Sequence, residues 1–133
     1  MILQKTAPNG KWVPNGKAIF VRRGRFGFDS GWVATVGGGI GVTNGEWHHV
    51  AVRFEAATTR MVMFVDGRPD GQRNIRLRSD PRSSPVRIGA AIPGYGAWTT
   101  FKGALDDIRI YKRLLTDQEI AKLAGVAAAA TGP

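Results

Sequence analysis

Two pairs of adjacent polar residues are the first candidates for chemistry in this sequence. Asp106 and Asp107 could act as a general acid and base, and His48 and His49 could bind a metal ion or abstract a proton. Both pairs lie in segments where apolar residues recur with period two, and neighbouring side chains on a strand point to opposite faces. The members of each pair therefore cannot flank one bond or hold one ion together. The sequence predicts no catalytic residue and no metal site.

Other catalytic patterns are incomplete as well. No expected strand carries acids at alternating positions, and no serine lies in a G-x-S-x-G elbow. The glycine-rich run at 37–41 is not followed by a helix, so we interpret it as a flexible turn and not as a phosphate cradle. We expect Asp106 to be a buried carboxylate that accepts backbone N–H groups, with Ca²⁺ ligation as the alternative. The protein is therefore expected not to be an enzyme.

Aromatic and arginine side chains are the candidates for ligand binding. An aromatic ring in the segment 91–100, which is expected to be a loop, could stack on the apolar face of a sugar or instead fill the core. Arginines that alternate with Ile75 and Leu77 would share one face of a strand. The ligand-binding candidates are Tyr95, Trp98, Arg76, Arg78 and Arg53. We assign Trp12, Trp32 and Trp47 mainly to packing.

The positive charge of the chain raises a further hypothesis. The formal net charge is +9, and six arginines cluster between residues 68 and 87. Such a cluster could bind an anionic glycan or the backbone of a nucleic acid, and Arg22 and Arg23 could extend a second basic surface. The alternative is a solvated outer face. Nucleic-acid binding is the weaker option, because no aromatic residue for base stacking lies within the arginine-rich section.

The arrangement of apolar residues predicts one β-rich domain. The chain has 133 residues and no cysteine, and no apolar run reaches the roughly 18 residues of a membrane-spanning helix. The first residues also lack the features of a signal peptide. We expect a domain at 1–124 and a flexible or extended tail at 125–133. The expected strands are 17–23, 25–30, 31–37, 47–55, 59–67, 74–78, 86–90 and 101–113.

A short helix is expected after the last of these strands. Thr116 and Glu119 have the spacing of a capping box, and Leu115 and Ile120 that of a hydrophobic staple. Gly125 is a natural end for this helix. Short strands, frequent glycine turns and one terminal helix are typical of a β-sandwich or a β-barrel. These features alone do not distinguish between the two.

Two sequence motifs resemble the laminin-G-like, concanavalin A-like domains of bacterial exported proteins. They are "WHHVAVRFE" followed by "RMVMFVDGR", and "FKGALDDIRIYKRLLTDQEI". Together with "VRIGA" between them, the resemblance covers about residues 45–124, and "ILQK" is similar to an earlier strand of such domains. The residues that match the family's structural signature are Trp47, His49, Asp66, Gly67, Gly103, Asp106 and Tyr111.

The resemblance implies an antiparallel two-sheet jelly-roll sandwich with a short C-terminal helix, lacking one or two of the usual first strands. It implies a non-catalytic module that recognises a glycan or a protein surface in an extracellular, periplasmic or cell-surface setting. Two alternatives stay open. The incomplete sandwich could be an assembly subunit that another copy completes by edge-strand pairing. The chain could also be a basic binder of nucleic acid or another anionic polymer. The resemblance also leaves open whether Ca²⁺ is bound.

Overall fold

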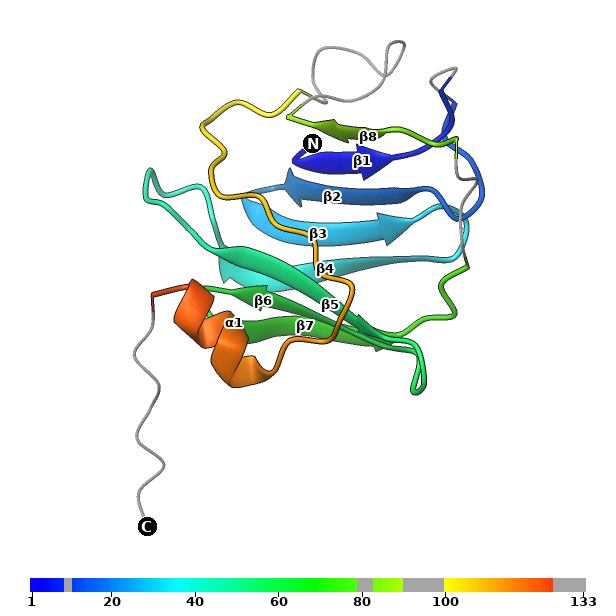
Figure 1. The fold of residues 1–133 in the computed structure, drawn as a ribbon. Helices are drawn as coiled ribbons and strands as arrows, with labels where there is room; N and C mark the ends of the chain where they lie inside the picture. The colour runs from blue at the N-terminus through cyan, green and yellow to red at the C-terminus, as the bar shows by residue number, and fades with distance from the viewer. Residues whose placement is uncertain (9–10, 79–82, 90–99, 126–133) are drawn as a thin grey trace.

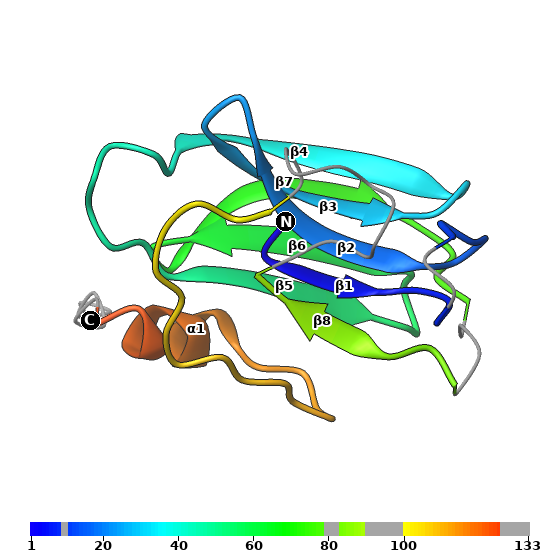
Figure 2. The same ribbon diagram turned by 90° about the horizontal axis from the view of Figure 1, so that it is seen from above.

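The computed structural model describes residues 1–8, 11–78, 83–89 and 100–125, and it contains two antiparallel β-sheets and one short helix (Figures 1 and 2). The five-stranded sheet has the order β4-β3-β2-β1-β8, and the three-stranded sheet has the order β5-β6-β7. This arrangement confirms the predicted all-β, two-sheet class. The first sheet consists of β1 (Leu3–Lys5), β2 (Lys17–Arg22), β3 (Arg25–Ser30), β4 (Ala34–Gly41) and β8 (Val86–Ile88). The second consists of β5 (Val50–Glu55), β6 (Arg60–Val65) and β7 (Arg68–Asn74).

The core lies between the two sheets because period-two alternation places one apolar set on each inner face. Phe26, Phe28 and Val36 of the five-stranded sheet pack with Met61 and Met63 of β6. Strand β6 is buried from Met61 to Val65, on both faces, as predicted for a strand in the middle of a packed layer. The second face of β6 is covered by the helix.

The helix α1 (Asp117–Leu123) confirms the predicted capping box. The Thr116 hydroxyl accepts the Glu119 N–H at 3.1 Å, and the Glu119 carboxylate accepts the Thr116 N–H at 2.8 Å. Ile120 is 1% exposed and packs with Val62 and Phe64 on the outer face of the three-stranded sheet. Figure 1 shows α1 lying against that sheet. Gly125 follows in a left-handed conformation, as expected at a helix end.

The glycine run at 37–41 is part of β4, so the prediction of a flexible turn was wrong. Asp70 of β7 explains why glycine is required there. Its Oδ1 accepts the N–H groups of Gly39 and Ile40 at 2.9 and 2.8 Å, and a Cβ atom at Gly38 would overlap its carboxylate. The glycines therefore let the edge of the second sheet approach the backbone of β4, and this contact joins the two sheets along one side.

Two other strand predictions were wrong. Residues 101–113 form no strand and pair with none among the described residues, although Phe101 donates its N–H to the Gly89 carbonyl at 2.8 Å. Residues 75–78 also lie outside the ladders, because the strand forms earlier, as β7 at Arg68–Asn74. Within 75–78, Ile75 is buried and Leu77 half-buried while the arginines are exposed, so the alternation exists without a neighbouring strand. Apolar alternation predicts which side is buried but does not supply a pairing partner.

The three-stranded sheet covers one side of the five-stranded sheet. Strand β6 contacts β3, and β7 contacts β4. The inner face is buried at Val36 of β4, which is 7% exposed, whereas Val86 and Ile88 of β8 are 44% and 51% exposed. Among the described residues, β5 pairs only with β6, so its second edge has no strand beside it. Within the same residues, we find no helix that is long and apolar enough to span a membrane.

Candidate functional site

The predicted ligand-binding residues do not come together in one site. Tyr95 and Trp98 lie outside the described residues. Arg76 and Arg78 are exposed, and Lys17 donates to the carbonyl oxygen of Arg78 at 3.1 Å. Arg53 lies apart from them, on the outer face of the three-stranded sheet beside α1. The assignment of these five residues to ligand binding stays a prediction.

Two of the tryptophans assigned to packing are exposed. The side chain of Trp32 is 72% exposed and that of Trp47 is 70% exposed, so the packing assignment was wrong for both. Trp47 precedes the first paired residue of β5, and Trp32 lies in the turn between β3 and β4. Neither residue lies in a paired strand, so strand pairing does not direct either indole toward the opposite sheet. Trp12 is half-buried.

A surface pocket lies beside the turn between β3 and β4. We call it the tryptophan pocket, and it has a volume of about 340 Å³. Its lining combines two indole rings with the carboxylate of Asp29 and the hydroxyl group of Thr35. The lining residues are Trp12, Asp29, Ser30, Trp32, Val33, Ala34 and Thr35.

The local backbone explains how the two tryptophans reach this pocket. Trp32 has a φ of 55°, a left-handed conformation that turns the chain out of β3 and leaves its indole exposed. Gly31 is hydrogen-bonded to the segment that follows Trp12. Its N–H donates to the Gly16 carbonyl, and its own carbonyl accepts the Asn15 N–H. A Cβ atom at Gly31 would overlap the Val13 carbonyl and lie 3.1 Å from the Trp12 indole nitrogen. Only glycine allows this close contact.

The accessible polar groups of the tryptophan pocket are the Asp29 carboxylate and the Thr35 hydroxyl, which hydrogen-bond to each other. Burial raises the pKa of the Asp29 carboxyl, and a hydrogen bond from Thr35 partly offsets this rise. Ser30 follows Asp29 on β3, so its side chain points to the core face of Phe26 and Phe28, and its fully buried hydroxyl is not accessible to a ligand. An aromatic face beside a carboxylate and a hydroxyl group is suited to a sugar ring, whose C–H face stacks on the indole while its hydroxyls donate and accept.

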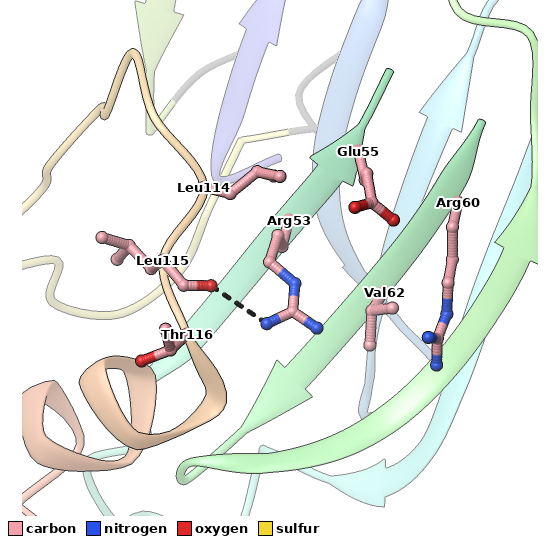
Figure 3. A pocket seen from close by; sticks show the side chains of 7 residues that line it. All are labelled: Arg53, Glu55, Arg60, Val62, Leu114, Leu115 and Thr116. Atoms are coloured by element: carbon pink, nitrogen blue, oxygen red, sulfur yellow. Dashed lines mark hydrogen bonds between the residues drawn. The ribbon is translucent and has the colours of Figure 1, made fainter. Parts of the chain in front are cut away.

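A second pocket lies between the three-stranded sheet and the residues before α1 (Figure 3). We call it the arginine pocket, and it has a volume of about 320 Å³. Its lining contains predicted Arg53, together with Arg60 and Thr116, which were not predicted to bind a ligand. The lining residues are Arg53, Glu55, Arg60, Val62, Leu114, Leu115 and Thr116.

Internal contacts hold the Arg53 side chain in the arginine pocket. Its Nη1 donates to the Leu115 carbonyl at 3.0 Å and to the Asp117 carboxylate, and its guanidinium lies 5.0 Å from the centre of the Phe64 ring. Figure 3 shows the guanidinium pointing toward the segment before α1. Arg53 therefore joins the helix to the sheet, and cation–π and ionic contacts already occupy much of its binding capacity.

The signature residues around Asp66 have a structural role. Asp66 Oδ2 contacts His48 Nδ1 at 2.8 Å, and Asp66 Oδ1 accepts the His49 N–H at 2.9 Å. Asp66 and Gly67 both have left-handed φ values and turn the chain from β6 into β7, as the D-G pair predicts. Burial lowers the pKa of His49, while the nearby Asp66 carboxylate acts in the opposite direction. These contacts fix the start of β5 to the end of β6.

The other signature acid differs from its prediction. Asp106 is exposed and not buried, although its Oδ1 does accept the N–H of Asp107 at 2.7 Å. Its segment pairs with no strand, so no second layer covers the carboxylate. Gly103 and Tyr111 lie in the same unpaired segment and are exposed. Within the described residues, no group of three or more histidine, aspartate or glutamate side chains could hold a metal ion.

Comparison with known proteins places this geometry in a family. A search of curated proteins gives no match. A solved structure, residues 221–444 of an S-layer domain-containing protein from Clostridium thermocellum, is similar with a TM-score of 0.54 and 25% sequence identity. The match covers 84% of this chain and 57% of that one. A laminin-G-type family model, described as the concanavalin A-like lectin/glucanases superfamily, matches residues 9–121. The chain therefore belongs to the concanavalin A-like lectin/glucanases superfamily.

Proposed function

We propose that this protein is a non-catalytic module that binds saccharide in the tryptophan pocket. The observation that carries the proposal is the 72% exposed indole of Trp32 beside the partly buried carboxylate of Asp29. Unlike the equally exposed Trp47, Trp32 shares a pocket with a second indole and a carboxylate, so its ring can serve as a stacking surface for a sugar. The neighbouring carboxylate and hydroxyl groups provide the directional bonds that fix a sugar's orientation.

The proposal is for binding and not for hydrolysis. Hydrolysis of a glycosidic bond generally uses two carboxyl groups on either side of that bond. Among the residues that line the tryptophan pocket, Asp29 is the only acid. A single carboxylate beside an indole can accept hydroxyl groups and orient a ring, which is the task of a recognition module.

A cell-surface setting fits this function. The solved structure that resembles the chain is described as an S-layer domain-containing protein, and the family description names lectins and glucanases. We infer that the chain acts outside the cytoplasm, where it recognises a surface polysaccharide. Localisation of a tagged full-length protein by cell fractionation would test this setting.

Substitution of Trp32 tests the proposed function. A panel of neutral and acidic oligosaccharides is screened on an array, and binding is then measured by calorimetry for the saccharide with the strongest signal. We expect Trp32→Ala to weaken binding by about 1 kcal/mol or more, as when an aromatic residue that dominates a binding site is truncated. The control is Trp47→Ala, which removes an equally exposed indole outside the pocket. Equal binding by wild type and Trp32→Ala would contradict the proposal.

A second candidate function is self-assembly through β5. Among the described residues, one edge of β5 has no strand beside it, and a strand of another copy could pair there. The outer face of β5 carries Arg53 and Glu55 two positions apart. Antiparallel pairing with Phe54 opposite Phe54 of the second copy would place each Arg53 opposite a Glu55. This charge complementarity favours a second copy over an unrelated strand.

The oligomeric state tests this second candidate. Light scattering across a wide concentration range should detect a dimer, and Val52→Pro should abolish it by removing an edge N–H and adding a ring. If both proteins are monomers at all concentrations, the assembly function is rejected. Saccharide binding by the monomer would still support recognition through the tryptophan pocket.

A further inference from the structure

Three arginines lie together at the turn between β2 and β3. Arg22 ends β2, Arg25 begins β3, and the two are directly opposite each other in the ladder. Arg23 and Gly24 form the turn between them, with φ values of 52° and 76°. Two left-handed residues make the hairpin turn that matches the twist of the strands. Figure 2 shows this turn projecting past the neighbouring strands.

Two features of this turn are unfavourable for folding. Like charges directly opposite each other on neighbouring strands repel, and here Arg22 faces Arg25. The left-handed position before glycine usually carries Gly, which has no Cβ, or Asn or Asp, whose short side chains can hydrogen-bond locally, yet it is occupied by Arg23. Both features concentrate positive charge at a position where neither packing nor turn geometry requires it.

No acidic side chain within the described residues neutralises this charge. The ion pairs there are His48 with Asp66, Arg53 with Asp117, Arg109 with Asp107 and Arg113 with Glu119. The backbone behind the turn is fixed, because Val42 donates its N–H to the Gly24 carbonyl at 2.7 Å. The turn therefore presents three unneutralised guanidinium groups on a supported backbone.

We propose that this turn, Arg22–Arg25, binds the sulfate or carboxylate groups of an acidic polysaccharide. A guanidinium can donate two parallel hydrogen bonds to either kind of group. Three guanidiniums within one turn match a polymer that carries an acidic group on successive sugars. Binding an anion between Arg22 and Arg25 would also replace their repulsion by two attractions. The proposal uses no residue of the tryptophan pocket, so either site can fail alone.

The position of the turn favours a polysaccharide over a nucleic acid. Arg25 and Ser30 are the two ends of β3, so the turn and the tryptophan pocket lie about 17 Å apart along one strand. A single glycan chain of a few sugars can extend over that distance. The turn itself contains no aromatic residue for base stacking, and three residues neutralise few phosphates.

Retention on immobilised polyanions tests the proposal with the intact chain. The probes are heparin, which carries sulfate, polygalacturonate, which carries only carboxylate, neutral dextran, and a duplex DNA. We expect binding to heparin, to polygalacturonate or to both. Replacing all three arginines by glutamine should weaken that binding by about tenfold or more, and lower the salt dependence by about one unit of slope per arginine.

Two variants serve as controls. Replacing Lys102, Lys112 and Lys122 by glutamine removes the same net charge from the C-terminal segment and should leave binding close to wild type. Replacing the three arginines by lysine keeps the charge and should restore only part of the affinity, because lysine cannot form the paired hydrogen bonds. Equal losses in the glutamine variants of both sets would overturn the proposal, as would binding to DNA alone. Trp32→Ala should retain polyanion binding, which separates this site from the proposed saccharide pocket.

Discussion

At the residue scale, one glycine determines whether the tryptophan pocket exists. Gly31 lies against the Trp12 indole and the Val13 carbonyl, where a side chain has no room. The exposed Trp32 follows it directly. The position of both indoles thus depends on a residue that takes no part in binding itself.

Gly31→Ala should therefore disturb the pocket and the stability together. The added methyl group must displace the Trp12 segment, and we expect a loss of roughly 1–3 kcal/mol in unfolding free energy, with weaker saccharide binding. Urea denaturation and calorimetry measure the two effects. Gly37→Ala is the matched control, because a Cβ atom there meets open space and should change little. An unchanged stability for Gly31→Ala would show that the Trp12 segment moves freely.

Two aspartates of the sequence signature should differ in their effect on stability. Asp66→Ala leaves the His49 N–H and the His48 ring without their acceptor, at an expected cost of roughly 1–3 kcal/mol. Asp106→Ala removes an exposed carboxylate and should change the unfolding free energy by less than about 0.5 kcal/mol. Urea midpoints of the two variants compare them directly. Equal midpoints would contradict the structural role given to Asp66.

Residue identities predicted these sites only in part. The D-G pair at Asp66 and Gly67 predicted its own turn, because the left-handed conformation depends on those two residues alone. The exposure of Trp32 and Trp47 could not be predicted, since it depends on whether the opposite sheet reaches them. Trp32 was placed within the expected strand 31–37, whereas the strand begins at Ala34 and Trp32 lies in the turn before it.

At the element scale, α1 was predicted correctly because its signals are short-range. The capping box spans four residues, and the staple and the terminal glycine lie within one turn of the helix ends. Residues 101–113 show the opposite case. Their alternation was visible, but a strand also needs a neighbour with free N–H and C=O groups, and the described residues place none beside them.

The cap of α1 gives a prediction for stability. Thr116→Ala removes the acceptor of the Glu119 N–H and should cost about 1 kcal/mol. Gln118→Ala, within the same helix, is the control and should have a smaller effect. Thermal unfolding of both variants provides the measurement. If the two midpoints agree, the cap does not limit the stability of the domain.

The same cap should weaken in acid. Hydrogen bonds from Arg113, followed by the backbone N–H of Thr116, lower the pKa of Glu119 from 4.5 to about 2. A carboxyl group whose pKa is lowered by folding stabilises the folded state fully above pH 4.5. This contribution is lost as the pH falls toward 2. The amide chemical shift of Thr116 should follow this titration, and Glu119→Gln should remove it. A midpoint near 4.5 would contradict the ion pair.

At the scale of the whole molecule, the two sheets differ in size. In the described part of the chain, five strands face three, so the apolar inner face is buried at β4 and exposed at β8. Apolar alternation predicted a β-sandwich or a β-barrel, and the family resemblance implied two stacked sheets. The sequence could not predict which strands remain uncovered, since the order β4-β3-β2-β1-β8 depends on pairings between distant segments.

Matched valine substitutions should detect this difference. Val36→Ala creates a cavity in the buried end of the core and should cost roughly 1–3 kcal/mol. Val86→Ala affects a half-exposed side chain and should cost less than about 0.5 kcal/mol in a monomer. Denaturant titration at low protein concentration compares them. A large effect of Val86→Ala that grows with concentration would instead indicate that a second copy covers β8.

Asp70 makes the sandwich mechanically asymmetric. Its carboxylate holds β4 and β7 together at one lateral boundary, while β5 and β8 have no equivalent tie among the described residues. Transient separation of the layers should therefore begin at β8 and β1 and reach the Asp70 boundary last. The amide protons of β8 and β1 would then exchange with deuterium sooner than those of β3.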